Sequence, residues 1–395
     1  MVHVLKKVDT FIMKLSEEKT KELKEQFREE IAHEFNIDVT RKMTGKISRF
    51  LHRFFLKKTI LHGFANLRNI SEGTPVIISA VHKSHIDYLS FGTTLYKFGD
   101  GLVPATIGGS NLFHGKFEKL LPQLKCVALD RDRVTPKKLR SHENLLYLST
   151  FYDYLMEDVI DKGEMITIFP EGGRSYSGKI LPLNLGIFGI AKRAINDKIK
   201  KVAIVPIGLS YDRVTEDCRF DGLRKYKEWN PSAYRKYDKR AFIHHAIFQP
   251  RTIAYIDIGK PMYIEDFRKL DKLEKELRMR MGNLIRVTPV TLICRAIAGK
   301  KITPLDEVVQ HIREDLKIIK KKNLLIGKGI RYRTASMIFR RSLEHLANRL
   351  RMRDIIRISK RDGKKVVVVR RKDVITYYVN TVAHLFNDDN TKNNK

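Results

Sequence analysis

A chain of 395 residues with 43% hydrophobic residues is long enough to bury one large core or two to three smaller ones, which excludes an intrinsically disordered protein. Lysine and arginine number 77 against 45 acidic residues, and the formal charge of +32 favours a polyanionic partner: nucleic acid, an anionic membrane or a phosphate-bearing substrate. The cysteines Cys126, Cys218 and Cys294 are far apart, so neither a disulfide framework nor a zinc cluster is predicted, and no cofactor is required.

Residues 1–60 are predicted to form an N-terminal helical arm. Charged residues interleave from Glu17 to Glu34 with apolar positions too sparse for a deep core, which indicates a solvated helix. From Met43 to Phe55, apolar residues at helical spacing lie opposite a cluster of lysines and arginines, which predicts a basic amphipathic helix. Such a helix either packs on the protein body or rests in the headgroup zone of a membrane.

No secretory leader is predicted, because dense charge follows the short segment Met1–Leu5. The longest apolar runs, such as Val202–Leu209 and Val287–Ile293, fall well short of the roughly 18 residues that a spanning helix needs. We therefore expect a cytoplasmic protein, and any membrane contact should involve one face of the molecule.

Residues 61–300 alternate short β-favouring runs with longer helical stretches, which is the pattern of an α/β layer fold. The predicted strands are Val76–Val81, Lys125–Leu129, Met165–Phe169, Val202–Ile207 and Thr252–Ile258. Residues 301–395 carry 24 basic and 10 acidic side chains, a formal charge of +14, and are predicted to form a separate, mainly helical C-terminal module. In this module the Asp362-Gly363 step between two β-favouring runs predicts a hairpin.

The first chemical motif is the strand that delivers His82 and, five residues later, Asp87. A turn after the strand can fold the carboxylate of Asp87 back onto one imidazole nitrogen, so that the other nitrogen accepts a proton from a hydroxyl. This is general-base chemistry without a protein nucleophile. Taken alone, the pair is more typical of a surface hydrogen bond, and His85 is an alternative base.

The second motif is a strand that runs into the glycine-rich, charged loop FPEGGRSYSGK, from Phe169 to Lys179. Its flexible backbone and cations suit a phosphate group. Gly173–Lys179 also fits the G-x-x-x-x-G-K start of a nucleotide-binding loop, but Ile180 stands where Ser or Thr would bind magnesium. Two more sequence blocks each end a predicted strand. The third block is Cys126–Arg133, with two arginines at its end, and the fourth is Val205–Asp212.

In order and spacing, these four blocks resemble those of the glycerolipid acyltransferase superfamily, and more narrowly the glycerol-3-phosphate acyltransferases. The narrower resemblance rests on the glycine-rich loop, on Val205–Asp212, on Gly109–Leu112 and on Tyr377–Phe386, which is similar to the C-terminal helix of the bacterial membrane-bound enzyme. It covers about residues 70 to 390. One departure lies in the second block, where glycerol-3-phosphate acyltransferases usually have two adjacent arginines. Here Asp130 precedes Arg131, as in lysophosphatidate acyltransferases.

The resemblance implies an α/β fold with a mixed, mostly parallel sheet flanked by helices, and a catalytic domain at residues 61–300. It implies transfer of an acyl group from acyl-CoA or acyl carrier protein to the 1-hydroxyl of glycerol 3-phosphate, giving lysophosphatidate in phospholipid biosynthesis. His82 would be the base and Asp87 would orient it, with no acyl-enzyme. Arg131 and Arg174 are the first candidates to bind the acceptor's phosphate. The full substrate-binding set is Arg131, Arg133, Glu171, Gly172, Gly173, Arg174, Ser175 and Lys179.

Several alternatives stay open. The acceptor could be lysophosphatidate or dihydroxyacetone phosphate, and the donor could be either thioester carrier. An anionic membrane surface is an expected partner, since each basic residue near anionic lipid contributes about 1 kcal/mol. A basic nucleic-acid-binding protein, with the C-terminal hairpin as part of a winged helix, is disfavoured because the charge is spread over the chain. An inactive membrane scaffold is the last alternative.

Overall fold

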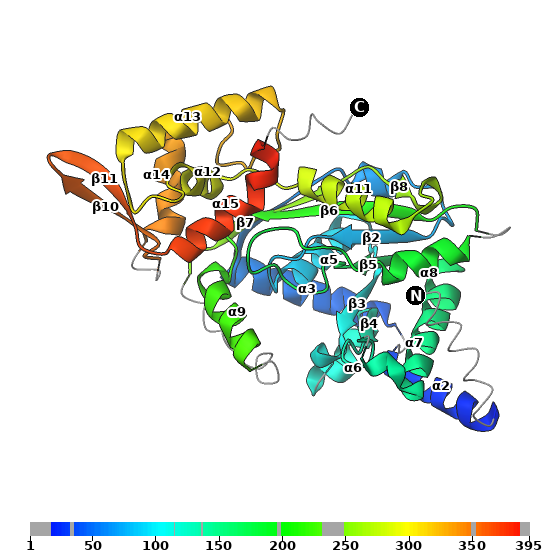
Figure 1. Ribbon diagram of the computed structural model, residues 1–395. Coiled ribbons are helices and arrows are strands. Elements are labelled where there is room, and N and C mark those ends of the chain that lie inside the picture. Colours follow the sequence, from blue (N-terminus) through cyan, green and yellow to red (C-terminus); the bar gives the residue numbers. More distant parts are fainter. Residues whose placement is uncertain are drawn as a thin grey trace.

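A large sheet with helices on both faces forms the centre of the protein, and a smaller unit of helices and short strands lies beside it (Figure 1). This computed structural model describes residues 17–31, 35–113, 115–135, 137–195, 199–230, 249–348 and 353–387. The predicted N-terminal arm is therefore described at residues 17–31 and 35–60, and the parts of that prediction that concern residues 1–16 and 32–34 lie outside the described residues.

In the described residues the large sheet has eight strands: β1 Leu56–His62, β2 Val76–Ala80, β3 Ala105–Gly109, β4 Cys126–Leu129, β5 Met165–Ile168, β6 Ala203–Tyr211, β7 Thr252–Ile258 and β8 Met262–Tyr263. Their order is β1-β7-β6-β2-β5-β3-β4, with β8 paired to β6. Strands β6, β2, β5, β3 and β4 share one direction, while β1 and β7 run the opposite way. The predicted mixed, mostly parallel sheet is thus confirmed.

The strands β2, β4, β5 and β6 end at the same edge of the sheet, because they all run in parallel. His82 follows β2, Arg131 follows β4, the glycine-rich loop follows β5, and β6 ends at Tyr211. Every residue of β2 is buried, as expected for a central strand covered on both faces. The topology therefore gathers all four sequence motifs at one edge.

The five predicted strands are all present, and the largest difference is that β6 continues to Tyr211 instead of ending at Ile207. Sequence analysis missed β1, β3 and β8. Strand β3 ends in two glycines, which lower the strand propensity. Strand β1 begins at Leu56, directly after the amphipathic helix, and pairs with β7. The sheet thus starts within the segment that was assigned to the arm.

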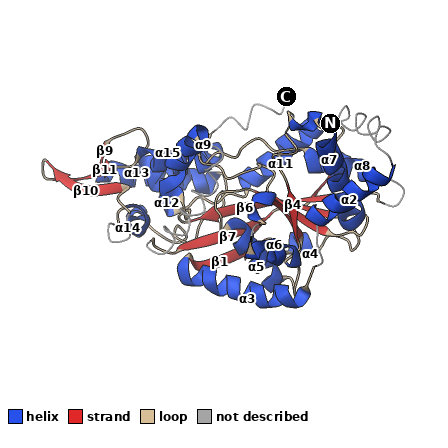
Figure 2. Ribbon diagram, turned by 90° about the horizontal axis from the view of Figure 1, so that it is seen from below, coloured by secondary structure: helices blue, strands red, loops and turns tan. Residues whose placement is uncertain are grey.

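Helices cover both faces of the sheet, with α11 on one face and α3 and α5 on the other (Figure 2). None of the helices in the described part of the chain is both long enough and apolar enough to cross a membrane. The helices before the C-terminal module are α2 Glu17–Ile31, α3 Ile37–Phe54, α4 Ala65–Arg68, α5 Asp87–Phe98, α6 Lys116–Gln123, α7 His142–Tyr154, α8 Gly186–Ala194, α9 Phe220–Trp229 and α11 Leu270–Asn283.

The first described helix, α2, is not solvated all round, which corrects the interpretation of residues 17–31 as part of a solvated arm. Phe27 and Ile31, one turn apart, are each 1% exposed, and the Phe27 ring packs edge-on against Tyr147 of α7. Arg28 forms ion pairs with Glu157 and Asp158, just beyond α7. Phe27 and Ile31, with Leu23 partly buried one turn before Phe27, dock this otherwise mainly polar helix.

The predicted basic amphipathic helix is confirmed as α3, which starts earlier than predicted because Asn36 caps its N-terminus. The Asn36 side chain accepts hydrogen bonds from the N–H groups of Asp38 and Val39. The helix packs on α5 and β1 and buries Leu51. Two large apolar side chains stay partly in solvent, since Phe50 is 48% and Phe54 37% exposed.

The C-terminal module contains the helices α12 Pro289–Ala296, α13 Leu305–Lys321, α14 Ala335–Leu346 and α15 Lys372–Phe386, with the strands β9 Ile302–Pro304, β10 Ile356–Arg361 and β11 Lys364–Val369. The predicted hairpin is confirmed, because β10 pairs with β11 across Asp362 and Gly363, both with positive φ. Helix α12 packs on α13, α14 and α15, so the packing unit starts before residue 301.

Candidate active site

The centre of the site is the pair formed by His82, which follows β2, and Asp87, the first residue of α5. The Nδ1 atom of His82 lies 2.9 Å from Oδ2 of Asp87. The same carboxylate, which is fully buried, accepts hydrogen bonds from the N–H groups of Lys83 and Ser84 and from the Tyr211 hydroxyl. Because a carboxylate accepts hydrogen bonds, Nδ1 carries the proton and Nε2 is left to accept another.

The surroundings of the imidazole keep it neutral. Burial lowers the pKa of His82, and the nearby charge of Arg174 lowers it further, while the hydrogen bond and charge of Asp87 act in the opposite direction. The ring of Phe169 lies 4.6 Å from the imidazole, centroid to centroid. A neutral imidazole with a fixed tautomer can take a proton from a hydroxyl that reaches Nε2.

The glycine-rich loop is folded around the histidine. The buried carboxylate of Glu171 accepts hydrogen bonds from the N–H groups of His82 and Leu181, each at 2.8 Å, and thereby ties the loop to the end of β2. The Ser175 N–H donates to the His82 carbonyl at 3.1 Å. Gly172 has φ of +71°, and a Cβ there would lie 2.6 Å from the Asn184 amide nitrogen, so this turn requires glycine.

Arg174, which was predicted as a first contact for phosphate, is turned inward. Its side chain is 4% exposed and donates to Glu216 at 3.1 Å and to the Tyr176 hydroxyl at 3.2 Å. Glu216, also buried, accepts further hydrogen bonds from the Ser84 hydroxyl and the His85 N–H. Arg174 therefore balances a buried carboxylate that braces the segment between His82 and Asp87.

The two arginines after β4 point to different places. Arg131 donates to the Gly172 carbonyl at 2.6 Å and lines the same cavity as His82. Arg133 instead pairs with Glu30 of α2 at 3.1 Å, and its guanidinium lies 5.3 Å from the ring centre of Phe27. Helix α2 thus supplies both an acid and an aromatic ring for Arg133, which was predicted to bind substrate.

The remaining predicted loop residues are Gly173 and Lys179. Lys179 is exposed, and its carbonyl accepts a hydrogen bond from the Ser175 hydroxyl. Gly173 is half-buried, with open space around the position of a Cβ. The loop does not run into a helix as a nucleotide-binding loop does, because α8 begins only at Gly186.

A cavity of about 190 Å³ opens beside the His82–Asp87 pair. His82, Arg131 and Phe169 line it, together with mainly apolar side chains from α3, α5, α6 and β3. These include Ile47, Leu89, Phe91, Leu95, Ile107, Leu121 and Leu124. Such a lining suits an alkyl chain whose polar end lies at the imidazole.

Sequence reasoning missed several residues around the site. Tyr211 lies in the fourth motif block, where a polar residue at the end of a central strand was a usable signal. Lys83 is 4% exposed, and burial lowers its pKa. Its position in the sequence, next to His82, gave no sign that its side chain is buried. Tyr377 of α15 is 3% exposed, and its hydroxyl has no hydrogen-bond partner in the described residues.

Helix α15 of the C-terminal module covers the glycine-rich loop. The Asn380 side chain donates to the Ser177 carbonyl at 2.9 Å. Gly178, with φ of +84°, lies so close to the helix that a Cβ would be 2.2 Å from the Tyr377 carbonyl oxygen. Among the described residues, no group of three or more His, Cys, Asp or Glu side chains could hold a metal ion. The site is thus built by two parts of the chain.

Comparison with known proteins gives a family match for the central part of the chain. Residues 62–210, from the end of β1 into β6, match the family model described as Acyltransferase. Among solved structures, the chain is similar to the crystal structure of the 1-acyl-sn-glycerophosphate (LPA) acyltransferase PlsC from Thermotoga maritima, with 17% sequence identity and a TM-score of 0.38. That alignment covers 62% of this chain and 78% of the other.

Proposed function

We propose, on the premise that residues 62–210 form an acyltransferase domain of the glycerolipid type, that this protein transfers a fatty acyl group from a thioester to the 1-hydroxyl of glycerol 3-phosphate, giving lysophosphatidate. The observation that carries the proposal is the cavity in which an imidazole oriented by a buried carboxylate, a guanidinium and an apolar lining meet. These three features match the three parts of the reaction: a hydroxyl, a phosphate and an acyl chain.

In the proposed reaction, Nε2 of His82 takes the proton of the acceptor hydroxyl while the oxygen attacks the thioester carbonyl. Asp87 stabilises the imidazolium that forms, because the carboxylate lies 2.9 Å from Nδ1. The tetrahedral intermediate then breaks its C–S bond, and the departing thiolate takes the proton back from the imidazolium. Cys126 also lines the cavity, but burial raises the pKa of its thiol to about 12, which disfavours a thiolate nucleophile.

Arg131 is proposed to bind the phosphate of the acceptor. We expect Arg131→Ala to raise the KM for glycerol 3-phosphate at least about tenfold, since a hydrogen bond to a charged group contributes about 1.5–3 kcal/mol. The KM for the acyl thioester should change little. Initial-rate kinetics with each substrate varied in turn would measure both constants.

Arg133→Ala is the matched control for this prediction. Its guanidinium contacts Glu30 and Phe27 of α2, so its removal should leave the acceptor KM unchanged and lower the free energy of unfolding by about 1 kcal/mol. Equal changes of the acceptor KM in the two variants would contradict the assignment of the phosphate to Arg131.

The pH dependence of kcat/KM should show an acid limb below pH 6.5. The neutral imidazole is the active form, and the pKa of His82 is lowered by burial, so activity is lost only as the pH falls through that lowered value. Burial also raises the pKa of Glu171 to about 7, and this group contacts the His82 N–H. An acid limb near pH 7 that disappears in Glu171→Gln would assign the limb to Glu171 and reject the prediction.

The test of the function is a panel of acceptors and donors. Purified protein is offered glycerol 3-phosphate, lysophosphatidate or dihydroxyacetone phosphate, each with labelled acyl-CoA and with labelled acyl carrier protein. We expect transfer to glycerol 3-phosphate, and no transfer by His82→Ala. A preference for lysophosphatidate would favour the second candidate, which the Asp130-Arg131 sequence supports. Transfer that survives in His82→Ala would reject the proposed base.

Attachment to the cytoplasmic face of an anionic membrane is part of the proposal. Phe50 and Phe54 pack against each other on α3 and remain exposed, on a helix that also lines the cavity. Lysines and arginines of the same helix suit anionic headgroups. The protein should sediment with acidic liposomes at low salt, and the double variant Phe50→Ser with Phe54→Ser should not. Equal sedimentation of both proteins would argue against α3 as the contact.

A further inference from the structure

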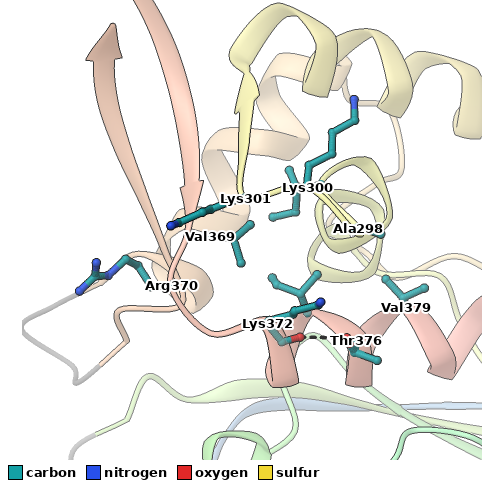
Figure 3. Close-up of a pocket in the computed structure, with 11 residues that line it drawn as sticks. Ala298, Lys300, Lys301, Val369, Arg370, Lys372, Thr376 and Val379 are labelled. Atoms are coloured by element: carbon teal, nitrogen blue, oxygen red, sulfur yellow. Dashed lines mark hydrogen bonds between the residues drawn. The ribbon is translucent and has the colours of Figure 1, made fainter.

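A second hollow lies in the C-terminal module, away from the His82 site. Its volume is about 460 Å³, and it is formed by the segment after α12, the end of β11 and the first turns of α15 (Figure 3). Helix α15 contributes Lys372, Ile375, Thr376 and Val379, which lie on one face of the helix. Asn380 of the same helix contacts the glycine-rich loop and does not line the hollow.

The floor of the hollow is apolar. Ile297 is fully buried and Ile375 is 3% exposed, while Val369 and Val379 are half-buried and face the opening. Between them these side chains offer a branched aliphatic surface without aromatic rings. A floor of this kind is suited to alkyl groups, and it offers nothing on which a nucleic-acid base would stack.

The rim of the hollow is cationic. Lys300, Lys301, Arg370 and Lys372 line the hollow, and in Figure 3 the side chains of Lys300 and Arg370 extend away from the apolar floor. Lys300 forms an ion pair with Glu307, and both side chains are more than half exposed. Arg370 lies 3.8 Å from Asp354. Exposed or long ion pairs of this kind are weak, so they leave the positive potential at the rim largely in place. Within the described residues, neither Lys301 nor Lys372 has a carboxylate within ion-pair distance.

The N-terminus of α15 adds to this positive field. The helix starts at Lys372, and no side chain forms a capping hydrogen bond with it. The N-terminal end of a 15-residue helix carries a partial positive charge, and Asp373 in its first turn is paired with Arg371. Positive charge at the rim and aliphatic surface at the floor together fit a ligand that has an anionic head and a short alkyl part.

We propose that this hollow is a binding site for a phosphate-bearing amphiphile, with the phosphate at the Lys301 and Lys372 rim and the first methylenes on the Ile375 and Val379 floor. The site is separate from the reaction cavity, because none of its lining residues is shared with the cavity beside His82. A monoalkyl phosphate in solution and a phospholipid in a bilayer both present a phosphate group and an alkyl chain. Two separate arms of the experiment therefore distinguish these sources.

The first arm measures binding by titration calorimetry on full-length His82→Ala protein, so that the result does not depend on acyl transfer. The probe is decyl phosphate below its micellar concentration, compared with inorganic phosphate and with decyl maltoside. Decyl phosphate should bind at least tenfold more tightly than either comparison molecule. The double variant Lys301→Glu with Lys372→Glu should weaken its binding at least tenfold, and Val379→Trp, which fills the floor, should do the same.

Lys320→Glu with Lys321→Glu is the matched control, since it makes the same change of charge at the end of α13. Equal weakening by this control would show attraction by net charge alone and would overturn the proposal. Equal binding of decyl maltoside, or unchanged binding in both rim and floor variants, would also overturn it.

The second arm repeats the comparison with vesicles that contain phosphatidic acid. Binding to both monomer and vesicles that depends on the rim supports a bilayer lipid as the ligand. Dependence on the rim with the monomer alone supports a free phosphate amphiphile.

Discussion

Asp87→Asn should lower kcat by about 10³- to 10⁴-fold while the protein stays folded. With its amide oxygen in the place of Oδ2, asparagine can still accept from the N–H groups of Lys83 and Ser84, and its NH2 group then faces the Tyr211 hydroxyl. Asparagine has no charge with which to stabilise an imidazolium, and in the opposite orientation of the amide its NH2 group would donate to Nδ1 and favour the wrong tautomer of His82. Single-turnover acyl transfer to the preferred acceptor would measure the loss, with circular dichroism as the check on folding.

Tyr211→Phe is the control for this prediction. It removes one of the donors to the same carboxylate and leaves the hydrogen bond between His82 and Asp87 in place. A hydrogen bond of this kind contributes about 1–3 kcal/mol, so the decrease in kcat should be much smaller than in Asp87→Asn. A kcat within about tenfold of the wild type for Asp87→Asn would mean that the carboxylate does not orient the base.

The positions of the motifs could be predicted because they depend on local rules. Each motif follows a short buried run, and parallel strands bring their ends to one edge whatever the order of the strands. The sequence therefore placed His82, Arg131 and the glycine-rich loop near one another before any contact was known. The family resemblance added which of these residues should react.

The partners of the charged residues could not be predicted, because they come from distant parts of the chain. Arg174 meets Glu216, which is 42 residues away, and Arg133 meets Glu30, which is 103 residues away. In the sequence all the arginines near the motifs are equivalent cations. Only packing separates Arg131, which lines the cavity, from two arginines whose charges are used inside the protein.

The role of the C-terminal module was also hidden in the sequence. Its basic composition suggested a separate unit, yet α12 belongs to its packing and α15 covers the glycine-rich loop. Helix pairing depends on which faces meet, and a single sequence shows the faces without their partners. For the same reason the apolar hollow ringed by cations was not visible as a pattern.

A buried charge network joins this module to the active site. The guanidinium of Arg353, which is fully buried, donates to both oxygens of Asp217 at 2.6 and 2.7 Å. The Tyr378 hydroxyl of α15 donates to the same carboxylate at 2.6 Å. Asp217 directly follows Glu216, which holds Arg174 and Ser84 in the site. The network therefore links the position of α15 to the segment that carries the base.

Arg353→Ala should lower the free energy of unfolding by about 3–5 kcal/mol, since it leaves Asp217 buried and unpaired. Burial alone raises the pKa of Asp217, but Arg353, Arg213 and Tyr378 together lower it to about 2. The stability that this depressed pKa provides is present above the ordinary value of 3.8 and is lost as the pH falls through about 2. In the variant the pKa of Asp217 is higher because burial acts with less opposition, so this carboxylate contributes less to the loss of stability on acidification, and the difference in unfolding free energy between the two proteins should shrink as the pH falls from 3.8 towards about 2. Urea unfolding at neutral and acid pH would measure both effects.

Arg357→Ala provides the comparison, because this side chain is 46% exposed and lies 3.6 Å from Asp354. Its removal should change the free energy of unfolding by less than about 1 kcal/mol. Because Asp217 adjoins Glu216, Arg353→Ala should also lower kcat at a temperature where the variant is fully folded, whereas Arg357→Ala should not. Similar decreases in the free energy of unfolding in both variants would contradict the prediction that the buried Arg353–Asp217 pair holds the module on the catalytic domain.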